Sequence, residues 1–416
     1  MLIHSAAQLL TLAGPPQRGK HLGKLTIVPD GAVYLHEDRI AEVGPSAVLR
    51  AKYPGVEELD ASGKVVLPGF IDPHTHAIWA GDRAAEFELK LEGKTYLEIL
   101  AAGGGILSTV SATRSASLDT LISETRKRLW RAFRHGSTTI EVKTGYGLDT
   151  ETELRMLAAI LALDEEGPWD LVPTFLGAHA IAPEFKGDPQ GYTDLICEEM
   201  LPDLLDWWSE HGGGRRLPYV DVFCETGAFD LAQSRQILET AKRLGFPLKI
   251  HADEFDNLGG ASLAVSLGAA SADHLVTTSD ADIEALAGSD TVAVGLPGTP
   301  FGLAHHDYTP AKKILAANGL LSLASDLNPG TTWCENLQMS IALACRYMKI
   351  TPAQAIAAAT INAAAAVDLA DEVGSLEAGK QADLLILDIS DYRQLGYRYG
   401  TNLVETVIKN GRIFQN

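Results

Sequence analysis

Cysteine and basic residues are both scarce in this sequence of 416 residues. The four cysteines form no C-x-x-C pair, so neither a disulfide scaffold nor a cysteine-ligated zinc site is indicated. The 34 lysines and arginines are outnumbered by 54 acidic residues, which gives a net charge of −20, and they form no basic block. A chain of this charge is a poor partner for nucleic acid or for an anionic membrane.

Long apolar runs are also missing. The longest, Ala353–Ala366, is interrupted by Gln354, Thr360 and Asn362, and it is too short and too polar to span a bilayer. The first residues lack the basic opening and the small-residue cleavage site of a signal peptide. Hydrophobic residues make up 46% of the chain, as is ordinary for a globular protein. We therefore expect a soluble, cytoplasmic protein with no membrane partner.

Short strand-like runs occur near both ends of the chain, at residues 31–36, 39–43, 382–387, 404–408 and 412–414. Asn410-Gly411 separates the last two runs, and Asn-Gly between apolar runs is a strong hairpin signal because both residues tolerate positive φ. We expect the two ends to pair into one small β-sandwich domain, since lone short hairpins are marginal in water. The alternative is that the strands at the two ends of the chain form separate additions to the barrel that do not pair with each other.

The middle of the chain alternates between strand-like and helical segments. The strand-like segments are Val65–His76, Thr138–Lys143, Leu171–His179, Tyr219–Glu225, Leu248–His251, Ala270–His274, Thr291–Leu296 and Leu321–Asp326. Helical patterns separate them, including an apolar spacing over residues 118–133 and a capping box at Thr150-x-x-Glu153. Eight such β/α units predict a parallel (β/α)₈ TIM barrel.

A doubly wound open α/β sheet is the structural alternative. It would normally show a glycine-rich turn after its first strand, where this sequence has His74-Thr75-His76. The barrel interpretation divides the chain into a barrel at 67–366 and a small domain built from 1–66 and 367–416.

Polar side chains end most of the predicted barrel strands, which is where barrel enzymes carry their functional groups. His-x-His on a strand places two imidazoles on one face, because side-chain direction repeats every two residues. The strand ends supply His74, His76, His179, Glu225, His251, His274 and Asp326. Imidazole nitrogens with a carboxylate oxygen suit a borderline divalent ion such as Zn²⁺ or Fe²⁺, so we predict a metal site.

A metal site of this kind needs groups that move protons. The ion lowers the pKa of bound water from 15.7 to roughly 7. His274 or Asp326 could accept a proton from that water, and Glu254, three residues after His251, could donate one to a leaving nitrogen. From spacing alone, Glu254 could equally be a solvated loop carboxylate or a helix cap, and His274 a hydrogen-bonded core histidine.

Several motifs resemble those of the amidohydrolase superfamily. They are Val66–His76, the later His251, His274 and Asp326, and the Gly374-x-Leu-x-x-Gly379 run near the end. A second set resembles the branch of this superfamily that hydrolyses the ring amide of 4-imidazolone-5-propanoate to N-formimino-L-glutamate in histidine degradation. That set comprises residues 102–108, 141–147, 177–180, 250–254, 271–274 and 326–330. The resemblance extends from about residue 60 to the C-terminus.

The resemblance implies a metal-dependent cyclic amide hydrolase that acts as a homodimer, with one divalent ion per chain, Zn²⁺ or Fe²⁺/Fe³⁺. The implied metal ligands are His74, His76, His251 and Asp326. The implied catalytic residues are Glu254, His274 and Asp326. The implied substrate contacts are Arg83, Tyr96, Tyr146, His179, Glu254, Asn328, Gly330 and Thr331.

The implied substrate is a small molecule that carries a carboxylate. The planar guanidinium of Arg83 can donate two parallel hydrogen bonds to a propionate carboxylate, a geometry that a lysine ammonium matches less well. Without the resemblance, Arg83 would be interpreted as a surface ion pair with Asp82 or Glu86, and Tyr146 as a packed aromatic ring. We prefer one metal ion per site, and the alternative is a pair of ions bridged by Glu225.

Three other functions use some of the same residues. A deaminase of an aminated purine or pyrimidine would keep the site, but Arg83 and Tyr146 favour a ring that bears a carboxylate. An interaction protein that has lost its metal should lack part of the ligand set, which is complete here. A glycosidase that uses Glu225 and Glu254 would leave the histidines unexplained.

Overall fold

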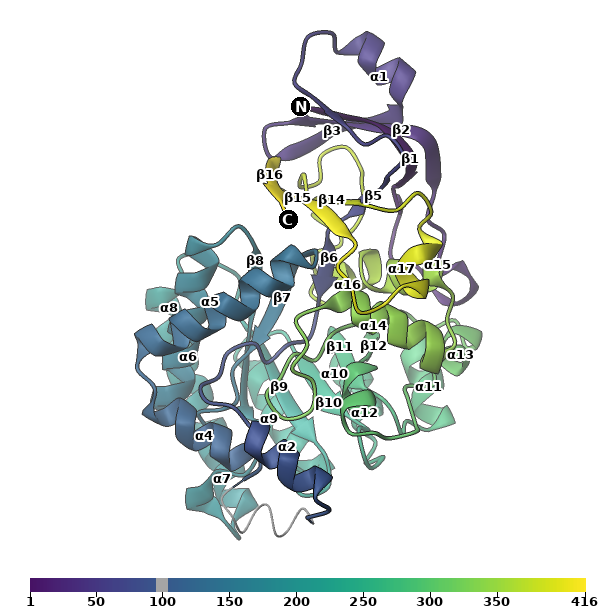
Figure 1. The fold of residues 1–416 in the computed structure, drawn as a ribbon. Coiled ribbons are helices and arrows are strands. Elements are labelled where there is room, and N and C mark those ends of the chain that lie inside the picture. Colours follow the sequence, from purple (N-terminus) through teal and green to yellow (C-terminus); the bar gives the residue numbers. More distant parts are fainter. Residues whose placement is uncertain (95–103) are drawn as a thin grey trace.

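A cylinder of parallel strands forms the main body of the protein in a computed structural model that describes residues 1–94 and 104–416 (Figure 1). Neighbouring strands are parallel in the order β13-β12-β11-β10-β9-β8-β7-β6. Their bounds are β6 (Phe70–Asp72), β7 (Ser137–Lys143), β8 (Asp170–Ala178), β9 (Tyr219–Cys224), β10 (Lys249–Ala252), β11 (Ser271–His274), β12 (Val292–Gly295) and β13 (Leu321–Leu323). The cylinder closes just beyond β6 and β13, where the His76 N–H donates to the carbonyl of Leu327 at 2.8 Å. The predicted barrel is confirmed.

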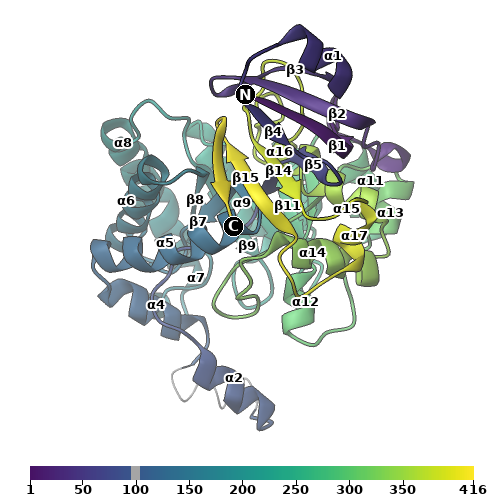
Figure 2. The ribbon, with the colours of Figure 1, turned by 45° about the horizontal axis from the view of Figure 1, so that its top comes forward.

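Helices surround this cylinder because each presents one apolar face to it. In α5 (Leu118–Arg134) the stripe of Leu121, Leu129 and Phe133 is buried, and Ser117 caps the first turn by accepting from the Thr120 N–H. The other main-body helices are α6 (Thr150–Glu166), α7 (Pro189–Leu195), α8 (Leu201–His211), α9 (Leu231–Arg243), α10 (Gly260–Leu267), α11 (Asp280–Ala287), α12 (Gly298–Gly302), α13 (Ala311–Ala316), α14 (Leu337–Leu343), α15 (Pro352–Ala358) and α16 (Ile361–Ala365). Helices α2 (Ala84–Leu91) and α4 (Ile106–Ser115) project from the body (Figure 2).

The two ends of the chain meet in a second, mixed sheet, as the sequence predicts (Figure 1). Its order is β16-β15-β14-β5-β1-β2-β3, and β4 pairs with β1. The N- and C-terminal halves join where β5 runs antiparallel to β14. The bounds are β1 (Leu2–Leu10), β2 (Ile27–His36), β3 (Arg39–Pro45), β4 (Glu58–Asp60), β5 (Val65–Pro68), β14 (Leu384–Leu387), β15 (Val404–Lys409) and β16 (Arg412–Gln415).

The segment between β1 and β2 packs this sheet onto the barrel. The Gln17 N–H donates to Oδ1 of Asn362 at 2.7 Å, and the Asn362 amide donates back to the Gln17 carbonyl at 2.8 Å. None of the helices in the described ranges combines the length and hydropathy that a bilayer-spanning segment needs.

Two local predictions are wrong. The first predicted strand, Val65–His76, is two strands that belong to different sheets. They are separated at Gly69, where a Cβ would lie 2.2 Å from Oγ1 of Thr138. The predicted capping box at the start of α6 does not form, because Asp149 caps the helix instead and accepts from the Thr152 N–H. The carboxylate of Glu153 is then available to bind the preceding loop.

Candidate active site

Histidines from three strands and a late aspartate converge at the carboxyl end of the barrel. Nε2 of His74 and Nε2 of His76 each lie 3.6 Å from Oδ1 of Asp326. Nε2 of His251 lies 3.2 Å from Nε2 of His76. Two atoms bound to one tetrahedral ion at 2.0–2.1 Å are about 3.3 Å apart, so these spacings suit ligands that share an ion.

Two overlapping sets of donor atoms could hold that ion. One is His74, His251 and His274, and the other is His74, His76 and Asp326; the atoms of each set lie within 4.8 Å of one another. Nε2 of His74 is buried without a hydrogen-bond partner, as expected for a nitrogen that serves a metal. Burial holds the pKa of His74, His76 and His274 well below its usual range, so their rings are neutral. These residues fit a divalent cation.

Two buried carboxylates contact two of the histidines at the candidate metal site, His74 and His251. Oδ2 of Asp273 lies 2.6 Å from Nδ1 of His74, and Oδ2 of Asp221 lies 2.9 Å from Nδ1 of His251. Lys143 compensates their charge, because its Nζ is 2.8 Å from Asp221 and 3.8 Å from Asp273. Such partners fix which ring nitrogen faces a metal.

These orienting groups are functional residues that the sequence analysis missed. Lys143 was included in a predicted strand and in the segment 141–147 without a role of its own, and it lies inside the barrel with no exposed surface. The available signal was the position of ionisable residues within apolar strands, as in Val220-Asp221-Val222, since charged side chains are seldom buried unless they are paired.

The backbone is strained at two of the reactive residues. His274 and Asp326 have φ of 78° and 53°, in the left-handed region that non-glycine residues seldom occupy. Hydrogen bonds hold both residues: Oγ1 of Thr309 donates to the His274 carbonyl at 2.6 Å, and Oγ1 of Thr299 donates to the Asp326 carboxylate. Burial raises the pKa of Asp326 to about 6.

A pocket of about 170 Å³ lies over this cluster. Its lining includes most of the predicted site residues and adds Ile106, Phe223 and Phe255, which the sequence did not indicate. The predicted residues in the lining are His76, Arg83, Tyr146, His179, His251, Glu254, His274, Asp326, Asn328, Gly330 and Thr331. His74 has no exposed surface, and Tyr96 lies outside the described residues.

Glu254 faces the cluster from the loop after β10. Its Oε2 lies 3.7 Å from Nε2 of His274. Burial, with smaller contributions from the charges of Asp326 and Glu225, holds the pKa of Glu254 well above its usual range. Glu225 accepts from the N–H groups of Phe255 at 2.9 Å and Asp256 at 3.1 Å, so it shapes the loop that carries Glu254. Within the described residues, Glu225 belongs to neither set of metal donors.

Arg83 both forms an ion pair and lines the pocket. Its Nε and Nη2 donate to the carboxylate of Glu86 at 2.8 and 2.5 Å, which is one of the contacts expected without the resemblance. Nη1 lies against Gly330, where an added Cβ would come within 2.5 Å of it. The Asn328 side chain shapes the same wall, because its Oδ1 accepts from the N–H groups of Gly330 and Thr331, each at 2.8 Å.

Nε2 of His179 is a hydrogen-bond acceptor toward the pocket, because the proton of the ring is on Nδ1. Its Nδ1 donates to the carbonyl of Gly145 at 3.0 Å, since a carbonyl can only accept. Burial lowers the pKa of His179 to about 3, so the ring carries a single proton and Nε2 has a free lone pair. The ring stacks on His76 with centroids 4.8 Å apart, and the Tyr146 ring is 5.2 Å away.

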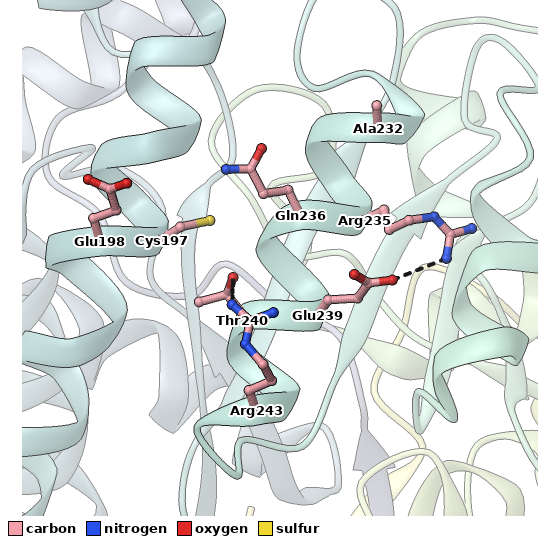
Figure 3. Close-up of a pocket in the computed structure, with 8 residues that line it drawn as sticks. All are labelled: Cys197, Glu198, Ala232, Arg235, Gln236, Glu239, Thr240 and Arg243. Atoms are coloured by element: carbon pink, nitrogen blue, oxygen red, sulfur yellow. Dashed lines mark hydrogen bonds and ion pairs between the residues drawn. The ribbon is translucent and has the colours of Figure 1, made fainter.

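A wider hollow of about 360 Å³ lies outside the barrel, between α9 and the segment η3 (Ile196–Met200) (Figure 3). Three of its charged side chains have partners on α9: Arg235 pairs with Glu239 at 3.4 Å, and Arg243 donates to Thr240 at 2.9 Å. No donor set for a metal in the described chain involves this hollow. The chemistry therefore belongs to the pocket at the barrel end.

Comparison of the sequence with known proteins gives matches over almost the whole chain. Residues 65–414 match the profile of the amidohydrolase family, and residues 31–55 match a bacterial imidazolonepropionase-like composite domain. The chain is 50% identical over 412 residues to an imidazolonepropionase of Herpetosiphon aurantiacus, covering 99% of this chain and 96% of that one. It is 47% identical over 417 residues to an imidazolonepropionase of Chloroflexus aggregans, covering 99% and 98%.

Solved structures share the architecture at much lower identity. An adenosine deaminase from Xanthomonas campestris with bound zinc has a TM-score of 0.72 at 18% identity, over 99% of this chain and 92% of that one. A 5-methylcytosine deaminase from Klebsiella pneumoniae has a TM-score of 0.73 at 18% identity, over 100% and 98%. At these identities the similarity shows the fold alone.

Proposed function

Since the chain belongs to the amidohydrolase family, and within it to the imidazolonepropionases, we propose that its barrel site hydrolyses the ring amide of 4-imidazolone-5-propanoate to N-formimino-L-glutamate. The chain is accordingly a hydrolase of carbon–nitrogen bonds in cyclic amides. One observation carries the proposal: three of the proposed metal ligands, His76, His251 and Asp326, line a single pocket together with the largely buried Glu254 and Arg83.

The site holds a divalent metal, for which we propose His74, His76, His251 and Asp326 as the ligands of a single Zn²⁺ or Fe²⁺/Fe³⁺ ion. Three distances between their donor atoms support this set: 3.2 Å between His251 and His76, and 3.6 Å from His74 and from His76 to Asp326. When bound, the ion supplies a Lewis acid that lowers the pKa of water to roughly 7. His274 belongs to the other donor set, with His74 and His251, and we propose it for proton transfer because its ring is neutral.

We assign the proton transfers to three residues. Asp326 or His274 accepts the proton of the attacking water, whose oxygen bonds to the ring carbonyl carbon. The carbon–nitrogen bond of the ring amide then breaks. Glu254 donates a proton to the departing nitrogen, a role supported by the raised pKa that keeps its carboxyl in the acid form.

For substrate orientation we propose contacts from Arg83, Tyr96, Tyr146, His179, Glu254, Asn328, Gly330 and Thr331. A carboxylate suits Arg83, since its guanidinium is already held at the pocket by Glu86. The lone pair of His179 at Nε2 favours acceptance of a substrate N–H.

The proposal covers the architecture as well. We infer a small β-sandwich domain from residues 1–66 and 367–416 around a barrel at 67–366, supported by the crossing from β5 to β6 at Gly69. We further infer a cytoplasmic homodimer. All four cysteines are unpaired, as suits a reducing compartment, and sedimentation of the purified protein measures the dimer.

An ultraviolet assay that follows loss of the imidazolone ring tests this function. Metal-loaded protein should turn over the substrate and release N-formimino-L-glutamate, and the Asp326→Ala and His251→Ala variants should lose both turnover and metal. Cytosine and guanine serve as control substrates, because ammonia release from either would support a deaminase instead. Full activity of a metal-free Asp326→Ala protein would overturn the proposal.

A further inference from the structure

Glu153 lies in the first turn of α6, fully buried, and its carboxylate binds the loop that follows β7. Oε1 accepts from the N–H groups of Gly147 at 2.7 Å and Leu148 at 2.8 Å. Oε2 accepts from the N–H of Gly145 at 2.8 Å. A carboxylate that accepts three backbone N–H groups fixes the shape of a loop much as a bound anion would.

This loop forms one wall of the active-site pocket. Tyr146 lines the pocket from within it, and the carbonyl of Gly145 accepts from Nδ1 of His179. Gly145 has φ of 107°, and a Cβ there would lie 2.9 Å from Nδ1 of His179. Gly145 is therefore seated tightly between the Glu153 carboxylate and the imidazole.

We propose that Glu153 is a positioning residue for the reaction, acting through Gly145 to fix the tautomer of His179. While the Gly145 carbonyl accepts a hydrogen bond from Nδ1–H of His179, Nε2 remains an acceptor toward the substrate. Glu153 itself is absent from the residues that line the pocket, so it acts only through the loop. The simpler alternative is a carboxylate that only stabilises the N-terminus of α6.

The Glu153→Gln substitution separates these two roles. An amide has one acceptor oxygen, so its NH₂ group must face one of the backbone N–H groups. Arg114 also holds the far side of the loop, donating from Nε to the Gly147 carbonyl at 2.6 Å. We therefore expect the substitution to release Gly145 and leave the Gly147 side in place.

Leu163→Ala is the matched control. Leu163 is fully buried near the other end of α6 and is not among the residues that line the pocket, so we expect the substitution to destabilise the helix packing. We expect both variants to lower the melting temperature. Only Glu153→Gln should lower kcat/KM, by tenfold or more, because misplaced contact groups cost catalysis out of proportion to stability.

The kinetic comparison rests on the proposed function. A spectroscopic measurement that does not depend on that function is therefore added. Two-bond ¹H–¹⁵N spectra of histidine-labelled, zinc-loaded protein report the tautomer of His179, with assignment from a His179→Asn variant. We expect the Nδ1–H form in the parent and in Leu163→Ala, and a mixture in Glu153→Gln. Glu153→Asp, which keeps the charge but withdraws it by one methylene, provides a second variant with the same expectation. An unchanged tautomer in a folded variant, with kcat/KM no lower than in Leu163→Ala, would overturn the proposal.

Discussion

Nδ1 of His74 and Oδ2 of Asp273 lie 2.6 Å apart, and neither side chain has any exposed surface. Burial raises the pKa of Asp273, and the charges of Lys249 and Lys143 oppose that shift by favouring the carboxylate, which can only accept a hydrogen bond. When Nδ1 of His74 donates to this carboxylate, the lone pair of Nε2 faces Asp326. One buried aspartate thus decides which nitrogen of His74 is presented to a metal.

Asp273→Asn should weaken metal binding by about 10–100-fold, the usual effect of removing a partner that orients a ligand. The amide can present its NH₂ to Nδ1 of His74, which favours the tautomer with the proton on Nε2. Competition with a chromophoric chelator measures the affinity.

Asp383→Asn is the control for loss of a buried carboxylate. Asp383 lies 2.8 Å from Nζ of Lys409 in the mixed sheet, far from the metal donors. The control should lower the melting temperature and leave metal affinity unchanged. Equal affinities in the two variants would contradict the role given to Asp273.

Metal removal should destabilise the protein as well as inactivate it. Nε2 of His74 is buried without a hydrogen-bond partner, so an ion that binds the folded site compensates a polar atom that is otherwise unsatisfied. At a free ion concentration of 1,000 times Kd, binding adds about 4.1 kcal/mol to the free energy of unfolding. Calorimetry before and after chelation, with zinc added back, measures this change, and identical melting curves would contradict it.

Periodicity predicted the part of the site that lies on strand ends. The two-residue repeat places His74 and His76 on one face, and the alternation of strands and helices brings His251 and Asp326 to the same end of the barrel. Asp221 was not predicted, because its function depends on a partner on another strand, and no local pattern carries that information.

The central strand of the mixed sheet was missed for a similar reason. β1 (Leu2–Leu10) lacks a clean alternation, and its register with β2 shifts between Ile3 and Ala6. Its stability comes from β2 and β5 on either side, pairings that are non-local in sequence. Glu153 was assigned to a helix cap, because the sequence does not show that Asp149 already caps the helix.

Glu254→Gln should lower kcat by at least about 100-fold and leave metal content unchanged, because a general acid typically contributes 10²–10⁴-fold and Glu254 is outside both donor sets. The raised pKa of Glu254 keeps the acid form present toward neutral pH, so activity should fall as pH rises through that pKa. This alkaline limb of the kcat profile should be absent in Glu254→Gln. Glu284→Gln, on α11, controls for the loss of one carboxylate. Normal turnover in Glu254→Gln would remove it from the proton path.

Gly330→Ala should impair recognition of the substrate carboxylate, because the new Cβ would lie 2.5 Å from Nη1 of Arg83 and displace the guanidinium. A hydrogen bond to a charged group is worth about 1.5–3 kcal/mol, so we expect KM to rise by about tenfold or more. An analogue without the propionate should show no such change, and metal content should stay the same. Gly288→Ala is the control, since its nearest neighbour is 3.6 Å away and its φ is −85°. Equal losses for the two substrates would show that Gly330→Ala disturbs the whole pocket, and would refute the assignment of Arg83 to the carboxylate.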